Sequence, residues 1–184
     1  MRETGKGAGS ITAKRQKYIE TAYGLFSSKN IESVSLEEIA RESGQSIATL
    51  YRYFTNKQTL VVETATWKWK QFGEDNQKRR PRANFEGMTA AEIFEFYLDS
   101  FLVLYRDHGD LLRFNQFFNV YIRAEKVDAG TLKPYQSMIC RLKDRFHVIY
   151  DRAQEDHTLR TDEPEEELLF QKNMILRESV NSDI

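Results

Sequence analysis

The chain has 184 residues, of which 40% are hydrophobic and 30% are charged, a composition that predicts a folded protein over most of its length. Its 9 glycines and 3 prolines are fewer than average usage gives, so turns are few and long helices are favoured over a many-stranded sheet. The longest apolar run covers only residues 101–105, far below the roughly 20 residues that cross a bilayer. We therefore expect no membrane span.

The sequence predicts a cytoplasmic protein without a metal or a cofactor. The first residues, MRETGKGAGSITAKRQK, lack the apolar core that a secretory signal needs. The single cysteine, Cys140, cannot form an internal disulfide, and the 3 histidines show no ligand spacing for a structural zinc. These features fit a reducing compartment.

Charge is unevenly distributed along the chain. Residues 1–80 carry 14 Lys and Arg against 9 Asp and Glu, a balance of +5, whereas residues 81–184 carry 13 against 19, a balance of −6. The N-terminal part is therefore a candidate for binding a polyanion. Charged runs are also typical of ordinary solvated faces, so this signal leaves both interpretations open.

The first predicted helix runs from about Thr12 to about Asn30. Ile19, Tyr23 and Phe26 fall on one face of it at helical spacing. Asn30 tolerates the left-handed backbone conformation that often ends a helix.

Two short helices follow. Ser35 and Glu38 have the spacing of a capping box, which starts a helix. Gly44 supplies the positive φ angle of a tight turn, and Ser46 caps a third helix over residues 47–53. Two short helices joined through a glycine turn predict a helix-turn-helix, although an ordinary helical corner fits the same spacing.

The rest of the chain is also predicted to be helical, which makes the protein all-α. The patterns cover residues 57–80, a segment from residue 89, residues 110–125, residues 131–156 and a last segment from Asp162, where Pro164 falls in the first turn.

Residues 33–57, SVSLEEIARESGQSIATLYRYFTNK, closely resemble the N-terminal DNA-binding domain of TetR-family transcriptional regulators. The shared pattern is Ile-Ala, a glycine turn, and then Ser-x-x-Thr-Leu-Tyr-x-Tyr-Phe-x-Asn-Lys. The helix around Ile19 and Phe26 resembles the family's first helix, so the resemblance covers about residues 12–62. It implies an N-terminal three-helix helix-turn-helix DNA-binding domain followed by a helical ligand-binding and dimerisation domain.

The predicted DNA contacts form two groups. Residues at the start of a recognition helix meet base edges in the major groove, and the base-facing candidates are Gln45, Ile47, Ala48 and Tyr51. The resemblance implies phosphate contacts through hydroxyl and ammonium groups, and these candidates are Ser35, Ser46, Thr49, Tyr53 and Lys57. Phosphate contacts fix the register on the duplex and add affinity without reading its sequence.

The chain departs from the family pattern at three positions. Gln45 stands where the family usually has an apolar residue, Ala48 where glycine is common, and Asn30 where a glycine usually ends the first helix. Gln45 therefore leaves open whether its side chain packs inward or faces DNA.

Residues 85–150 hold thirteen of the twenty-three aromatic residues. The resemblance implies an effector pocket in this part of the chain, suited to an apolar or aromatic ligand. The candidate lining residues are Phe94, Tyr97, Phe101, Phe114, Phe117, Phe118 and Tyr121. Aromatic residues at helical spacing are also ordinary core, so pocket and core both remain open.

No enzymatic site is predicted. The sequence has no Gly-rich phosphate loop, no nucleophile elbow and no metal-ligand spacing. Cys140 falls within a predicted helix, where a packed thiol is expected. A rival hypothesis is a small-molecule-binding protein or enzyme that keeps the helix-turn-helix only as a scaffold.

The resemblance implies a homodimeric, ligand-responsive repressor that a small effector releases from a near-palindromic DNA operator. The expected division is a flexible arm over 1–11, the helix-turn-helix domain over 12–56, a connecting helix over 57–80 and an effector-binding and dimerisation domain over 81–184. An activator or a nucleoid-type binder is the alternative within the DNA-binding class.

The expected dimer leaves one question open. In the family, two C-terminal helices from each subunit usually build the interface, yet only 20 residues follow Pro164. Either the dimer uses a reduced surface or the given sequence lacks residues.

Overall fold

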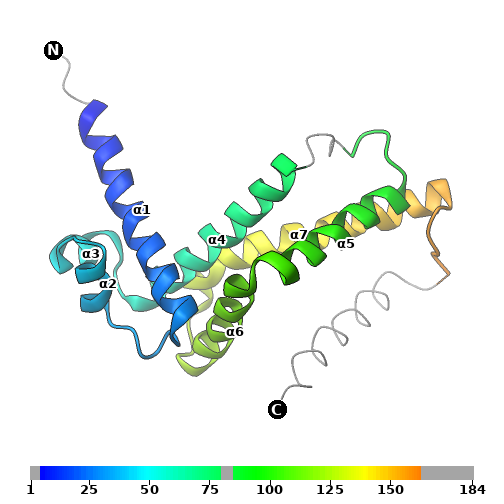
Figure 1. Ribbon diagram of the computed structural model, residues 1–184. Coiled ribbons are helices and arrows are strands. Elements are labelled where there is room, and N and C mark those ends of the chain that lie inside the picture. The colour runs from blue at the N-terminus through cyan, green and yellow to red at the C-terminus, as the bar shows by residue number, and fades with distance from the viewer. Residues whose placement is uncertain (1–4, 80–84, 163–184) are drawn as a thin grey trace. The chain divides into compact units, whose positions relative to one another are not determined.

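The computed structural model describes residues 5–79 and 85–162, apart from the side chains of 5–11 and 140–146, and these ranges contain helices and no strand (Figure 1). The helices are α1 (Gly5–Ser28), α2 (Leu36–Glu42), α3 (Ile47–Tyr53), α4 (Lys57–Arg79), α5 (Ala90–Asp107), α6 (Gly109–Ala124) and α7 (Ala129–Asp156). The predicted all-α class is confirmed. None of the described helices combines the length and the apolar character needed to cross a membrane.

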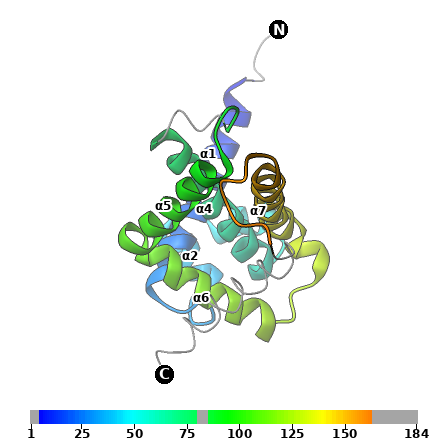
Figure 2. The same cartoon turned by 90° about the vertical axis from the view of Figure 1, so that its right-hand side faces the viewer.

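Helix α1 is longer than its sequence pattern indicates. It begins at Gly5, so the predicted start near Thr12 is wrong, and much of the segment expected to be a flexible arm is helical. The prediction relied on apolar periodicity, which starts late in this helix, whereas extending an existing helix by one residue costs little once the first turn has formed. The N-terminal turns of α1 project beyond α2 and α3 in both views (Figure 1, Figure 2).

The described chain forms two compact units. Residues 5–79 and 101–139 form the first, and residues 85–100 and 140–162 form the second. The predicted division placed everything from residue 81 onward in one domain, whereas here residues 101–139 pack with the N-terminal helices. The functional division of the chain stays a prediction. The predicted helix beyond Asp162 lies outside the described residues.

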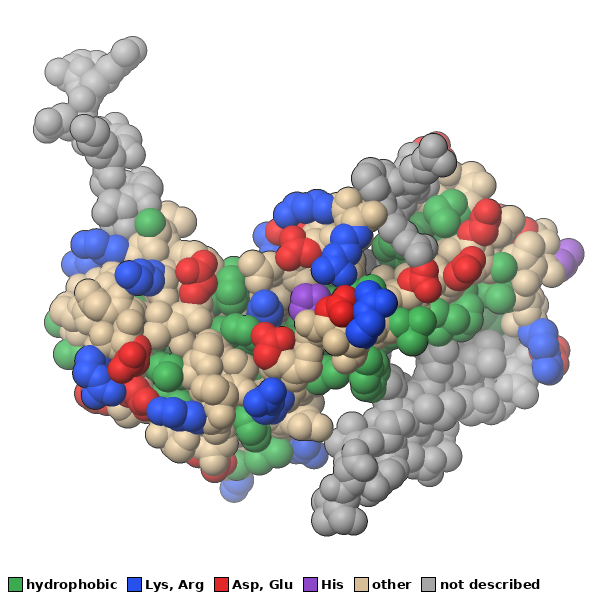
Figure 3. Space-filling view, in the orientation of Figure 1, with side chains coloured by type: hydrophobic (Ala, Val, Ile, Leu, Met, Phe, Trp, Pro, Cys, Tyr) green, Lys and Arg blue, Asp and Glu red, His purple; other side chains and the backbone are tan. Residues whose placement is uncertain are grey.

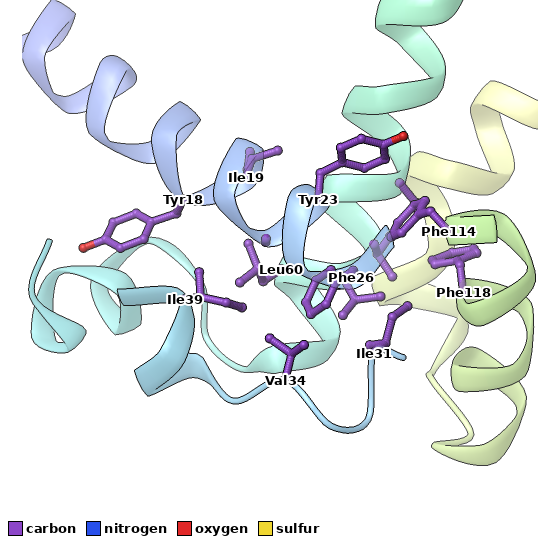
Figure 4. Packing of buried hydrophobic residues seen from close by; sticks show 14 of the residues in the cluster. Tyr18, Ile19, Tyr23, Phe26, Ile31, Val34, Ile39, Leu60, Phe114 and Phe118 are labelled. Carbon is purple, nitrogen blue, oxygen red and sulfur yellow. The ribbon is translucent and has the colours of Figure 1, made fainter. Parts of the chain in front are cut away.

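The core of the first unit joins the three N-terminal helices to α4 and α6. Helix α1 contacts α2, α3, α4 and α6. Phe26 of α1 is fully buried and lies beside Phe114 and Phe118 of α6 (Figure 4). Ile39, Leu50 and Leu60 bring α2, α3 and α4 to the same cluster; all three are fully buried. Each such side chain contributes about 1.5–3 kcal/mol by leaving water.

The second unit has a small core of its own. Ala90 and Ile93 of α5 pack with Ile149 and Ala153 of α7. The Asp156 carboxylate accepts the Ala90 N–H at 2.7 Å and so caps the start of α5. This bond adds to a local capping box, in which the Thr89 hydroxyl accepts the Glu92 N–H at 3.3 Å and the Glu92 carboxylate accepts the Thr89 N–H at 2.8 Å.

Two glycines of the first unit should respond to alanine in opposite directions. Gly44 has φ +66° and open space around it, so Gly44→Ala should lower the free energy of unfolding by about 1–2 kcal/mol through backbone strain alone. Gly24 lies inside α1 with equally open space, and Gly24→Ala should raise it by about 0.5–1 kcal/mol. Urea unfolding followed by circular dichroism measures both. Equal effects of the same sign would contradict the assigned turn.

Candidate nucleic-acid interface

Local capping interactions build the helix-turn-helix. The Ser35 hydroxyl accepts the Glu38 N–H at 3.0 Å, which confirms the serine half of the predicted capping box. Gly44 adopts φ +66°, as predicted for the turn. The Ser46 hydroxyl accepts the Thr49 N–H at 3.2 Å, so the predicted cap of α3 is confirmed. Each cap of this kind stabilises its helix by about 1 kcal/mol.

Helix α1 holds the start of α3 in place. The Tyr18 ring is fully buried in the core, and its hydroxyl donates to the Ser46 carbonyl at 2.8 Å. Burial raises the pKa of Tyr18, so the phenol stays protonated and remains a donor. The Gln45 side-chain amide donates to the Lys14 carbonyl of α1 at 3.0 Å. Two hydrogen bonds therefore fix the first turn of α3 against α1.

An ion pair ties α1 to α4 behind α3. The Arg15 guanidinium pairs with the Glu63 carboxylate and lies 5.4 Å from the centre of the Phe54 ring. Phe54 and Leu50 are fully buried and form the inner side of α3. Burial raises the pKa of Glu63 despite the nearby Arg15. Helix α3 is therefore braced from its inner side.

The four base-facing candidates differ in exposure. Ala48 and Tyr51 lie on the outer side of α3, with 51% of Tyr51 exposed. Ile47 is half-buried and packs against the core. Gln45 is half-buried, its amide nitrogen is engaged by Lys14, and its side-chain oxygen is buried without a partner among the described residues. The structure therefore presents Ala48 and Tyr51 outward, next to the exposed Arg52.

The phosphate candidates are also unequal. Ser35 and Ser46 are exposed, although the Ser46 hydroxyl donates to the Thr49 hydroxyl at 2.9 Å. The Tyr53 ring packs against Tyr18, and within the described part of the chain its buried hydroxyl has no hydrogen-bond partner. A phosphate could reach that hydroxyl only if neighbouring groups moved.

Lys57, the fifth phosphate candidate, lines a pocket that is open to solvent and is called the cavity below. The cavity has a volume of about 380 Å³ and is lined by Glu32, Asn56, Lys57, Gln58, Tyr121 and Glu125. The Lys57 ammonium donates to the Glu32 carbonyl at 3.2 Å and lies 5.7 Å from the centre of the Tyr121 ring. No pattern in the sequence predicts this cavity, because its walls come from the loop before α2, the start of α4 and the end of α6.

The seven candidate pocket residues do not share one cluster. Phe114, Phe118 and Tyr121 are buried in the core of the first unit, and Phe117 packs against that core. Phe94 and Tyr97 belong to the cluster of the second unit, and Phe101 is 41% exposed. Tyr121 alone among the seven lines the cavity described above. Core packing is what the structure shows for Phe114 and Phe118.

Charges of both signs are interspersed around the first unit. On the face in Figure 3, Lys and Arg side chains alternate with Asp and Glu side chains. Lys14 and Lys17 of α1 and Arg52 of α3 are exposed. The Lys and Arg residues within residues 12–79 are thus spread over several helices.

Two tyrosine hydroxyls allow a matched test of how α1 holds the start of α3. Tyr18→Phe removes the bond to Ser46 and should lower the free energy of unfolding by about 1 kcal/mol. Tyr53→Phe removes a buried hydroxyl that has no partner among the described residues and should leave stability unchanged or raise it by about 1 kcal/mol. Chemical denaturation measures both variants. A larger loss for Tyr53→Phe than for Tyr18→Phe would contradict the role assigned to the Tyr18 hydroxyl.

Comparison with known proteins agrees with the geometry. Residues 19–64 match the family described as bacterial regulatory proteins, tetR family. An HTH-type transcriptional regulator of Staphylococcus aureus (strain MRSA252) is 28% identical over 156 residues, which cover 80% of this chain and 71% of that relative. Another, from Staphylococcus aureus (strain bovine RF122 / ET3-1), is 41% identical over 68 residues, 33% of this chain and 37% of the relative.

A solved structure supports the same fold. A Vibrio parahaemolyticus protein, described as a transcriptional regulator of the TetR family, has a TM-score of 0.64 to this chain, covering 93% of this chain and 88% of that one at 16% identity. The match identifies residues 19–64 as a domain similar to the N-terminal domain of TetR-family transcriptional regulators, and the solved structure shows that the helical fold of the chain is similar to that of one such protein.

Proposed function

We propose that the protein is a homodimeric, ligand-responsive repressor that binds a near-palindromic operator through α3. The observation that carries this proposal is the outer side of α3, where Ala48, Tyr51 and Arg52 are exposed while Leu50 and Phe54 are fully buried behind them. A short helix with one free side and a rigid support suits insertion into a major groove, which is wide enough to admit a helix.

The exposed side chains suit two kinds of DNA contact. Ala48 can pack on a thymine methyl group, and the Tyr51 hydroxyl can hydrogen-bond a base edge. Thr49 and the exposed Ser35 offer hydroxyls to phosphates at the edges of the groove. In a dimer, two such helices would enter successive major grooves about 34–36 Å apart.

Effector responsiveness is supported by the packing of α6 on α1. The Phe114 ring centre lies 5.3 Å from that of Tyr23 and 6.5 Å from that of Phe26. The Tyr23 hydroxyl donates to the Asp110 carboxylate at 2.6 Å. Burial would raise the pKa of Asp110, but hydrogen bonds from Tyr23 and Leu111 and the charge of Lys68 lower it below its usual value.

These contacts suggest how an effector would act on DNA binding. An effector that rearranged the aromatic side chains of α6 would shift α1, and α1 carries Tyr18, which holds the start of α3. Helix α4 contacts both α1 and α6 and would move with them. A coupling free energy of about 1–3 kcal/mol is typical of such linkage.

Selection from a randomised duplex pool, followed by titration of the full chain with the selected duplex between about 50 and 200 mM salt, tests the DNA-binding proposal. The logarithm of the affinity should fall linearly with the logarithm of the salt concentration, because phosphate contacts release counterions. The rival scaffold hypothesis predicts no salt-dependent binding to any duplex. An affinity equal for selected and random duplexes would instead indicate a nucleoid-type binder.

Two substitutions on α3 should distinguish recognition of bases from contacts with phosphates. Tyr51→Ala should change the preference at one base position by about 1–3 kcal/mol. Thr49→Val keeps the shape of the side chain but removes its hydroxyl, so it should weaken binding to all duplexes by a similar factor. Competition titrations against single-base variants of the selected duplex measure both effects. A uniform loss for Tyr51→Ala would remove Tyr51 from the base-facing residues.

A further inference from the structure

The side chain of Lys57 is half-buried and folds back against the first unit. It is the first residue of α4, three residues after the fully buried Phe54 that caps the end of α3. Its ammonium donates to the Glu32 carbonyl at 3.2 Å and lies 5.7 Å from the centre of the Tyr121 ring. The Lys57 ammonium, which is suited to binding a phosphate, therefore contacts groups of the protein instead.

The cavity around Lys57 has the chemistry of an ammonium site. The face of an aromatic ring attracts a cation, and burial keeps Tyr121 a neutral phenol by raising its pKa to about 12. Burial lowers the pKa of Lys57, while Glu125 and Glu32 oppose that change by attracting the positive charge. The carbonyl and one acidic side chain come from Glu32 in the loop before α2, and the ring and the other acidic side chain come from the end of α6.

We propose that Lys57 is an internal latch: its ammonium holds the start of α4 to the end of α6 in the DNA-free protein, and it must leave the cavity before it can neutralise a phosphate. This inference rests on the proposed DNA binding. One ammonium cannot occupy both places, so every interaction that retains Lys57 in the cavity opposes DNA binding by the same free energy. The latch therefore lowers the affinity for DNA from a position outside α3.

The position of the cavity couples the latch to α6. Tyr121 lies in the last turn of α6, and Glu125 directly follows that helix. The Gln58 side-chain amide donates to the Glu125 carbonyl at 3.5 Å, next to Lys57 in sequence. A shift of α6 that withdrew Tyr121 would release Lys57, and by reciprocity DNA binding would favour that shifted position of α6.

The latch is tested by removing the charges that retain Lys57. Glu32 and Glu125 are both exposed, so Glu32→Gln combined with Glu125→Gln should leave the fold intact. We expect the affinity of the full chain for the selected duplex to rise about 1.5- to fivefold, the range that exposed charge pairs allow, because the substitutions remove the attraction of the two carboxylates and keep the hydrogen bond to the Glu32 carbonyl and the Tyr121 ring.

A matched control separates the latch from a general loss of negative charge. Glu20 and Glu37 are exposed on α1 and α2 and lie outside the cavity, so Glu20→Gln combined with Glu37→Gln removes the same charge. Both pairs of substitutions are also made in a Lys57→Ala chain. The latch predicts that the extra gain from the cavity pair disappears in that chain, while the gain from the control pair remains.

A second variant tests the aromatic contact. Tyr121→Leu removes the ring, and because Tyr121 is buried its thermal unfolding is measured first. A folded Tyr121→Leu chain should bind the selected duplex more tightly than the wild-type chain, and only when Lys57 is present. The latch would be overturned if the increase in affinity for the duplex persisted in full in the Lys57→Ala chain. It would also be overturned if neither the glutamate pair nor Tyr121→Leu increased that affinity. A wild-type chain that binds no duplex would instead overturn the proposed function.

Discussion

The position of α3 depends on the hydrogen bond that the Tyr18 hydroxyl donates to the Ser46 carbonyl. The ring of Tyr18 is fully buried, so its hydroxyl is held at a fixed point by core packing rather than by a flexible surface side chain. Its acceptor is the backbone of the residue that caps α3. The direction of a seven-residue helix, too short to be stable alone, is thus set by α1 and by whatever positions α1.

Helix α6 is attached to the N-terminal helices at both of its ends. At its start, Asp110 accepts a hydrogen bond from Tyr23 of α1 at 2.6 Å. At its end, the Tyr121 ring lies near the Lys57 ammonium of α4. Between these points Phe114 and Phe118 are fully buried beside Phe26. A displacement of α6 cannot be absorbed at one end alone, because close-packed interiors transmit strain. Coupling to α3 through α1 and release of Lys57 would then occur together.

The sequence predicted those features whose partners are close in the chain. Ser35, Gly44 and Ser46 act on residues within about one helical turn, so their pattern is sufficient to place α2 and α3. The aromatic residues of α6 could not be divided between pocket and core, because the contact of Phe114 with Tyr23 joins residues on different helices. The orientation of Gln45 depends on the Lys14 carbonyl, 31 residues earlier. The start of α1 was missed because its first turns carry no apolar periodicity.

In the DNA-free helix-turn-helix, the apolar side chains are well packed, but some polar groups are buried without hydrogen-bond partners or partly desolvated. Within the described residues, the Tyr53 hydroxyl and the Gln45 side-chain oxygen are buried without a partner, and each such group costs about 1–3 kcal/mol. Lys57 is partly desolvated in its cavity, which lowers its pKa. All three residues belong to the predicted DNA contacts, and departures from local rules are expected at functional sites. A duplex that supplied an acceptor to the Tyr53 hydroxyl and a donor to the Gln45 oxygen would recover part of that free energy, whereas the contacts that retain Lys57 oppose the bound state.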